Sequence, residues 1–324
     1  RWSFSAIKAE RDGNGVHDLH RPEDVVPVTG GADEGEEPED ADPGAVASPV
    51  APPAVPSAPA APMPWAEIGG GTAFGTFVHE VMERLDPQSP SLDADVKATV
   101  SHLLYRHRLD LAPAEVVAGL RAALHTPLGP LFDGRSLAQI GAADRLAELD
   151  FELALRGGEG TLPASAIGEV LLATLEADDP LRGYAEELAA GRIDVTVAGY
   201  LRGSIDAVFR IPDAEVGHRY LVVDYKTNRL HGRHDTDPLA AYRPALLPAE
   251  MAHTDYALQA LLYSVAVHRY LRWRQPGYRP EAHLGGVGYL FMRGMVGPST
   301  PVENLVPYGV FSWRPPAATV VALD

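Results

Sequence analysis

Apolar residues recur at helical spacing over much of the chain between residues 72 and 190. At about 100° per residue, one apolar stripe is formed behind a glycine-rich loop by Phe74, Val78, Val81 and Leu85. Thr72 stands where an N-cap residue is expected, so a helix is predicted to open there. The same spacing predicts further helices near residues 94–108, 113–125, 167–176 and 181–190.

From about residue 192 the pattern changes to alternation. Strands are predicted at 194–201 and 204–211 around a turn at Arg202–Gly203, then at 220–226 and 286–292, with a long amphipathic helix over 256–273 between the last two. The predicted order of elements is helix, hairpin, strand, helix and strand. This order implies a mixed central sheet flanked by helices. The fold class is therefore α/β, with a largely helical insertion over 87–191.

Residues 1–64 show neither period. An acidic block over 33–42 carries seven carboxylates, and a Pro/Ala-rich run, SPVAPPAVPSAPAAPMP, follows it. Such a composition buries too little apolar surface to offset the entropy of ordering, and its prolines favour extended backbone. We expect a disordered, semi-rigid tether over 1–64 and a folded domain over 65–324.

Composition narrows the function. The chain has no cysteine, which excludes disulfides, thiolate metal sites and cysteine nucleophiles and fits a reducing cytoplasm. No run of 18 apolar residues indicates a membrane span. The net charge of −17 weakens a nucleic-acid-binding interpretation, although basic residues cluster locally over 226–243 and 269–274.

The strongest chemical signal is Asp224-Tyr225-Lys226 at the end of an apolar strand. Residues two apart on a strand share a face, so an acid and an amine project together where unpaired charge would be costly. A second acid, Asp206, stands opposite an apolar face formed by Ile205, Ala207 and Phe209 and follows Gly203 by three residues. Taken singly, these are also typical of a surface salt bridge and of a hairpin glycine beside a solvent-facing acid.

Two helical pairs complete the set of candidates. Gly75 and His79 lie one turn apart on the first helix, and Gln259 and Tyr263 lie one turn apart on the late helix. Alone, the histidine could be a structural hydrogen-bonding residue and the second pair a polar helix edge.

In this order, Gly-x-x-x-His, Gly-x-x-Asp, Asp-x-Lys and Gln-x-x-x-Tyr resemble the RecB-type branch of the PD-(D/E)xK, or restriction-endonuclease-like, nuclease superfamily. The runs YALQALLYSVAVHRYLRWR, GGVGYLFMRGM, RLAELDFELAL and RWSFSAI are similar to the carboxy-terminal nuclease domain of RecB, the subunit of the RecBCD helicase–nuclease, and to the seam before it.

The resemblance implies a divalent-metal-dependent exodeoxyribonuclease that acts in DNA repair and recombination at double-strand ends. It implies Mg²⁺, with Mn²⁺ able to substitute, held by His79, Asp206, Asp224 and the backbone carbonyl of Tyr225. It makes Asp206, Asp224 and Lys226 catalytic, with Lys226 positioning water or neutralising charge, and gives Gln259 and Tyr263 a role in binding substrate or orienting the lysine.

The same resemblance implies linear DNA as substrate, RecC-like and RecD-like partners, a cytoplasmic location, and ATP used only by a helicase region before the tether. Two alternatives remain. One is a catalytically inactive PD-(D/E)xK fold that serves as a DNA-binding or scaffold module, against which the retention of all three catalytic residues argues. The other is a nuclease that works outside any helicase complex.

Overall fold

A computed structural model describes residues 63–154, 161–193, 196–198, 200–230 and 237–324. The predicted tether therefore lies outside the described residues, apart from Met63 and Pro64. The helices are α2 (Thr72–Arg84), α3 (Leu92–His107), α4 (Pro113–His125), α5 (Ala164–Thr174), α6 (Arg182–Ala189), α7 (Leu247–His253), α8 (Tyr256–Arg274), α9 (Pro280–His283) and α10 (Ala317–Leu323). None of them is long and apolar enough to cross a membrane.

A five-stranded mixed sheet forms the centre, in the order β1-β4-β5-β6-β9. Its strands are β1 (Arg145–Ala154), β4 (Tyr200–Asp213), β5 (Gly217–Lys226), β6 (Leu284–Phe291) and β9 (Val310–Trp313). Only β5 and β6 pair in parallel, joined by the crossover through α8. Two small sheets pair β2 (Thr161–Pro163) with β3 (Thr196–Ala198), and β7 (Val302–Glu303) with β8 (Val306–Pro307). The predicted α/β class with a mixed sheet is confirmed.

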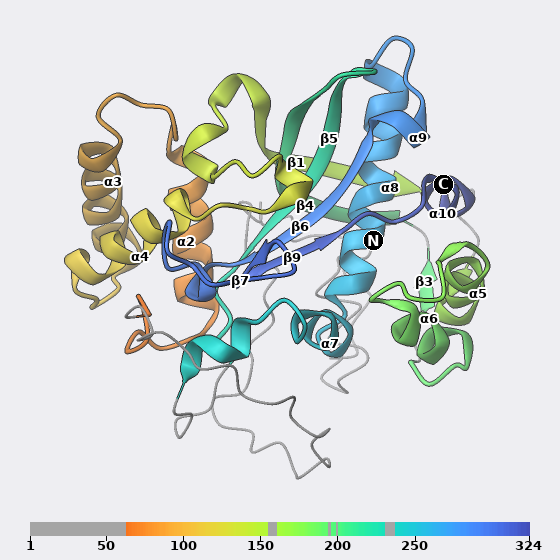
Figure 1. The fold of residues 1–324 in the computed structure, drawn as a ribbon, viewed down its shortest axis with the longest axis horizontal. Coiled ribbons are helices and arrows are strands. Elements are labelled where there is room, and N and C mark those ends of the chain that lie inside the picture. The colour runs from red at the N-terminus through yellow and green to blue at the C-terminus, as the bar shows by residue number, and fades with distance from the viewer. Residues whose placement is uncertain (1–62, 155–160, 194–195, 199, 231–236) are drawn as a thin grey trace, which may run out of the picture.

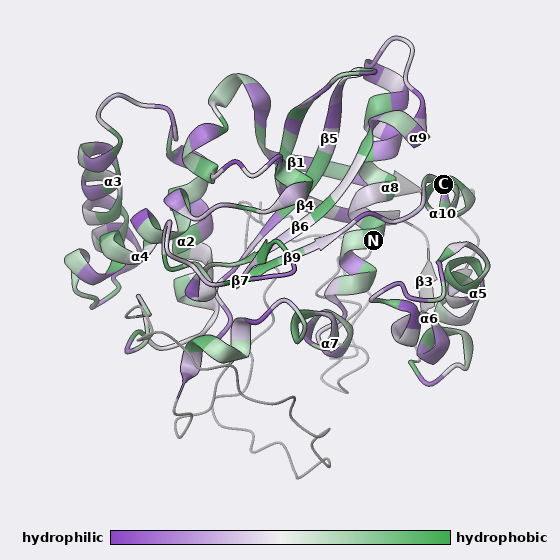
Figure 2. Cartoon of the chain, viewed as in Figure 1, coloured by the Kyte–Doolittle hydropathy of each residue, from purple (hydrophilic) through white to green (hydrophobic). Residues whose placement is uncertain are grey.

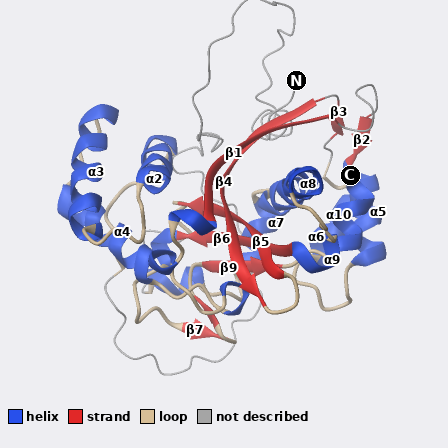
Figure 3. Ribbon diagram, turned by 90° about the horizontal axis from the view of Figure 1, so that it is seen from above, coloured by secondary structure: helices blue, strands red, loops and turns tan. Residues whose placement is uncertain are grey.

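Helices cover the sheet on both faces. Figures 1 and 3 show α2, α3 and α4 on one side and α8, α10, α5 and α6 on the other. Each layer has its own apolar cluster: Phe77 and Val81 of α2 pack with the α2-side residues of β5, while Leu258 and Leu261 of α8 pack with Val222. Figure 2 shows hydrophobic and hydrophilic colour alternating around α3 and α4, as expected of helices with one buried face.

The late helix differs from its prediction. We expected α8 to be amphipathic, yet every residue from Tyr256 to His268 is buried. The helix lies beneath the sheet and also contacts α7 and α10, so several elements cover its sides. It is therefore a core helix over most of its length, and its few polar side chains must find partners inside the protein.

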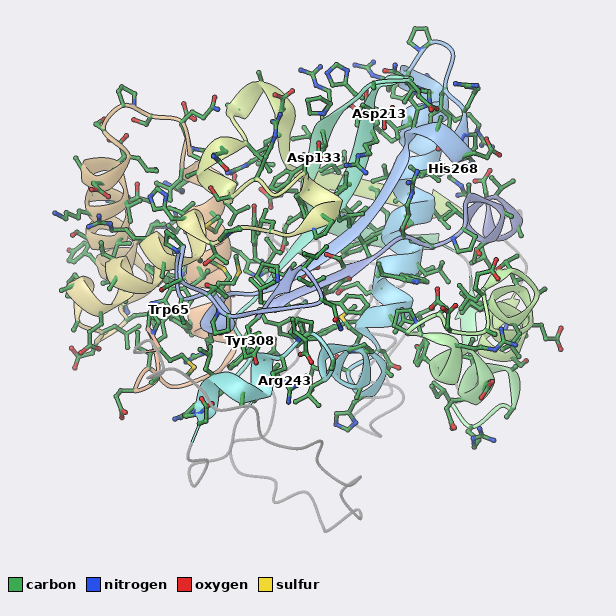
Figure 4. All side chains as sticks on the ribbon, viewed as in Figure 1. Trp65, Asp133, Asp213, Arg243, His268 and Tyr308 are labelled. Carbon is green, nitrogen blue, oxygen red and sulfur yellow. The ribbon has the colours of Figure 1, made fainter. Side chains whose placement is uncertain are left out.

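The hairpin predicted around Arg202–Gly203 is wrong. The chain runs straight through these residues within β4, and Gly203 pairs with Phe151 of β1. A Cβ on Gly203 would lie 2.9 Å from the Phe151 ring, so the glycine allows close approach and does not make a turn. The turn that joins β4 to β5 lies at Asp213, at the far end of the sheet from Trp65 (Figure 4).

Two smaller expectations also change. The N-cap of α2 is Gly71, at φ +115°, and Thr72 is the first helical residue, because the glycine adopts a backbone conformation that threonine resists. Ile205 packs into the cluster around α8, whereas Ala207 and Phe209 pack on the α2 side, so the three do not share one face. The stretch 87–191 holds four helices and also β1, an edge strand of the central sheet.

A buried arginine ties the segment before α2 to the end of β5. Arg293 is fully buried, and its guanidinium donates to the carbonyls of Thr227, Trp65, Ile68 and Gly69. The guanidinium also lies 5.4 Å from the Phe74 ring centroid. The residues flanking Lys226 and α2 are thus held by one side chain.

We expect Arg293→Met to lower the free energy of unfolding by about 3 kcal/mol or more, because several buried carbonyls would lose their donor. Arg274→Met is the matched control: Arg274 is exposed beside Trp273, and its loss should change stability by less than about 0.5 kcal/mol. Urea unfolding of both variants checks this. Equal, small losses in the two variants would contradict the role of Arg293.

Candidate active site

The site forms where β4 and β5 separate. Their antiparallel pairing ends at Ala207 and Val223, whereas β5 stays paired with β6 as far as Lys226. A strand residue points its N–H and C=O to the same neighbour, so Tyr225 directs both groups into the gap that β4 has left.

Two side chains fill that gap. The Tyr225 N–H donates to Asp206 Oδ2 at 2.7 Å, and His79 Nε2 lies 2.6 Å from the Tyr225 carbonyl oxygen. His79 Nδ1 lies 3.2 Å from Asp206 Oδ1, which closes the ring of contacts. Both imidazole nitrogens thus face oxygen atoms. The structure brings together residues that lie 146 positions apart in the sequence.

Asp224 and Lys226 share the other face of β5, as predicted. Lys226 Nζ lies 2.9 Å from Asp224 Oδ1, and both side chains are less than 5% exposed. The ammonium also lies 4.0 Å from the centre of the Tyr256 ring and 5.6 Å from that of Tyr289. A carboxylate and two aromatic faces therefore compensate a charge that is almost fully removed from water.

Gln259 and Tyr263 stabilise this arrangement from behind. Tyr289 donates its hydroxyl hydrogen to Gln259 Oε1 at 2.9 Å, and Gln259 Nε2 donates to the Tyr263 hydroxyl at 3.1 Å. All three side chains are buried. Gln259 and Tyr263 are thereby linked through hydrogen bonds to Tyr289, whose ring lies beside Lys226.

The pKa values of the two aspartates are shifted in opposite directions. Burial, together with the neighbouring Asp206 carboxylate, raises the pKa of Asp224 to about 7 even though Lys226 opposes the shift. For Asp206, burial acts upward, but His79 and the Tyr225 N–H outweigh it and hold the pKa below its usual range. Two carboxylates held close together in this way would be neutralised by a bound cation.

A cavity of about 330 Å³ opens beside this centre. It is lined by Thr76, His79, Glu80, Glu83, Arg84, Arg106, His107, Glu148, Ser204, Asp206 and Tyr225. Asp224 and Lys226 are absent from this lining and lie behind Asp206 and Tyr225. Three of the four residues of the candidate ligand set, His79, Asp206 and Tyr225, therefore line the cavity.

Glu148 marks an irregularity at the cavity. It has φ +53° within β1, and the pairing of β1 with β4 skips it at the position opposite Asp206. Burial, followed by the carboxylate of Glu83, raises the pKa of Glu148. A non-glycine residue in the left-handed region is a local strain, and such strain is concentrated at functional sites.

The donor set suits a hard or borderline cation. It comprises one imidazole, two carboxylates and one backbone carbonyl, which are ligands that Mg²⁺ and Mn²⁺ accept. Among the described residues no three histidine, aspartate or glutamate side chains are arranged as a formed metal centre. Instead, His79 pairs with Asp206, and Asp224 pairs with Lys226. The residues fit the ion chemically.

Sequence reasoning missed several residues of this site. Tyr256 and Tyr289 flank Lys226, and Glu148 faces Asp206, yet none was a candidate. Tyr256 and Tyr289 stand in runs already noticed, next to the Gln-x-x-x-Tyr pair and inside the GGVGYLF strand. Only the fold places them beside the lysine.

The mixed sheet, with an Asp-x-Lys strand end facing a second aspartate and a helical histidine, defines a nuclease fold of the restriction-endonuclease type. The chain belongs to the PD-(D/E)XK nuclease superfamily, whose family model matches residues 66–301. The resemblance seen in the sequence is thereby confirmed.

Curated relatives agree with this assignment. The chain is 45% identical over 317 residues to the RecBCD enzyme subunit RecB of Mycobacterium tuberculosis, covering 95% of this chain and 28% of that protein. It is 47% identical over 266 residues to RecB of Mycolicibacterium smegmatis (81% of this chain, 24% of the relative) and 33% identical over 263 residues to RecB of Escherichia coli (78% and 19%). The chain spans about a quarter of the relatives it matches, and it fits their carboxy-terminal nuclease domain.

The raised pKa of Asp224 predicts a pH-dependent stability. The folded protein holds the Asp224 proton more tightly than the unfolded chain does, so this group stabilises the fold below about pH 4, and that stabilisation is lost as pH rises toward 7. In EDTA, the wild type should lose about 2 kcal/mol more than Asp224→Asn between pH 5 and 8, at about 1.4 kcal/mol per pKa unit. Urea unfolding at both pH values measures the difference. Parallel profiles for the two proteins would contradict the shift.

Proposed function

We propose that the chain is a divalent-metal-dependent DNA nuclease that hydrolyses phosphodiester bonds at the gap between β4 and β5. The observation that carries the proposal is the convergence of His79, Asp206 and the Tyr225 carbonyl in front of the buried Asp224–Lys226 pair. A structural salt bridge needs none of the first three, and a scaffold needs no lysine held at 3% exposure.

Each residue has a distinct task in this proposal. His79, Asp206, Asp224 and the Tyr225 carbonyl would hold Mg²⁺ or Mn²⁺, and the ion would polarise the scissile phosphate and acidify a water. Asp224 would hold the ion as the carboxylate. Lys226 stands beside Asp224 and would neutralise charge that develops on the phosphate or position the water. Tyr256 and Tyr289 fix the ammonium, and Gln259 and Tyr263 fix Tyr289.

The relatives suggest the setting in which this chemistry takes place. They are named subunits of the RecBCD enzyme, and this chain corresponds to about a quarter of each. We propose that the chain acts as an exonuclease on linear double-strand ends and unwound single strands, in the cytoplasm, in an assembly with RecC-like and RecD-like subunits. ATP would serve a helicase region and not this site.

Degradation of linear DNA by the chain, with Mg²⁺ and without it, tests the activity. Asp224→Asn and Lys226→Gln should each lower the rate by about 100-fold or more, because each removes a charge that acts in the transition state. Glu215→Gln is the control: it removes an exposed charge near the β4–β5 turn, at the other end of the sheet, and should leave the rate unchanged. Thermal melts confirm that the variants fold. No cleavage by wild type, even with partner subunits and ATP, would favour the inactive scaffold.

The imidazole ligand predicts a metal preference. Nitrogen ligands suit Mn²⁺ better than Mg²⁺, so Mn²⁺ should support cleavage, and His79→Ala should raise the Mn²⁺ concentration needed for half-maximal rate by about 10-fold or more. Titrating the rate with each metal gives the values. A wild-type enzyme that is inert in Mn²⁺, or a His79→Ala variant with an unchanged Mn²⁺ requirement, would remove His79 from the ligand set.

A further inference from the structure

A cluster of cations lines the same cavity. Arg84, Arg106 and His107 all contact the single carboxylate of Glu80. We call these three residues the Glu80 rim. They line the cavity together with Asp206 and Tyr225. From this geometry we infer that the Glu80 rim binds backbone phosphates of one DNA strand next to the scissile bond, an inference that rests on the proposed nuclease function.

The charge balance of the cluster favours an anion. Two guanidinium groups and one imidazole surround a single carboxylate, so the guanidinium groups alone outnumber the carboxylate by two to one. One cation from α3 would be enough to link α3 to α2 through Glu80. The additional cations are therefore available to bind a further anion.

The guanidinium groups remain accessible. Arg84 is 43% exposed and Arg106 is 53% exposed, whereas Glu80 is only 12% exposed. An arginine carries five N–H donors, more than a contact with one carboxylate requires. Because both side chains are exposed and line the cavity, a phosphate can approach them without displacing Glu80.

The rim is geometrically tied to the candidate metal ligands. Glu80 directly follows His79 on α2, so the two side chains leave adjacent positions of one helix. Arg106 and His107 come from the last turn of α3, which packs against α2. A strand whose scissile phosphate lies at His79 and Asp206 would pass a neighbouring phosphate over the rim.

Two further acidic residues, Glu83 and Glu148, line the same cavity. Their carboxylates repel phosphates, whereas the Glu80 rim attracts them. We take single-stranded DNA as the ligand, because a cavity of about 330 Å³ is small beside a duplex and proteins hold single strands in positively charged grooves.

Binding of a fluorescein-labelled single-stranded 20-mer to the full chain in EDTA tests the inference. Arg84→Gln and Arg106→Gln should each weaken binding several-fold and lower the slope of log Kd against log salt concentration by about 0.7, as expected for one lost phosphate contact. Arg121→Gln is the matched control, since Arg121 pairs with Asp93 at 47% exposure and is not part of the cavity lining. It should leave both quantities unchanged.

The Glu80→Gln variant distinguishes a phosphate-binding role of the cluster from a purely structural role in holding α2 and α3 together. Neutralising the carboxylate frees the cations, so the variant should bind the 20-mer more tightly than wild type even if it melts at a lower temperature. Weaker or unchanged binding by Glu80→Gln would overturn the inference, as would equal affinities of Arg106→Gln and Arg121→Gln. An equal loss on a 20-base-pair duplex would overturn the assignment to a single strand.

Kinetics distinguish this inference from the proposed function. In cleavage assays the arginine variants should raise KM and keep kcat at saturating DNA, whereas Lys226→Gln lowers kcat. A fall in kcat with unchanged KM in Arg106→Gln would count against a binding role. If the wild type binds DNA but never cleaves it, the proposed function fails. The salt dependence of Kd in the arginine variants still shows whether the Glu80 rim binds phosphates.

Discussion

The candidate site depends on the backbone of Tyr225, whose N–H and C=O lose their strand partner where β4 leaves β5. Buried backbone groups without hydrogen bonds are strongly unfavourable, so something must replace the missing strand. Asp206 and His79 do so, and this brings them within 3.2 Å of each other. The candidate ligands therefore converge because the sheet is irregular at this point. A sheet that stayed paired to its end would leave no room for them.

Burial of the Asp224–Lys226 pair constrains the layer behind it. Removing one partner from a buried ion pair leaves an uncompensated charge, so Lys226 needs Asp224 and the rings of Tyr256 and Tyr289 together. Those rings are held in turn by the polar chain through Gln259. This agrees with the burial of α8 from Tyr256 to His268, although its sequence suggested an amphipathic helix. The polar side chains of Gln259 and Tyr263 find their partners inside the protein, next to the site.

The periodicity of apolar residues predicted those features of the fold and the site that depend on residues close together in the sequence. The shared face of Asp224 and Lys226, the helix that carries His79 and the mixed sheet all follow from residues a few positions apart. Gly203 was misread because its role is set by Phe151, about 50 residues earlier, whose ring fills the space a Cβ would need. The carbonyls that bind Arg293 and the cations around Glu80 likewise come from distant segments. No sequence pattern of short range reports such contacts.

The strongly acidic composition and a DNA substrate are compatible because charge acts locally. At physiological salt, screening limits each charge to about 8 Å, so the net charge of −17 on the whole chain matters less to a phosphate than the groups lining one cavity. That cavity is lined by the acidic residues Glu83 and Glu148 and also by the Glu80 rim. A phosphate in it is repelled by the carboxylates and attracted by the cations. Acidity elsewhere then suppresses binding away from the site, so productive and unproductive binding differ more than in an evenly basic protein.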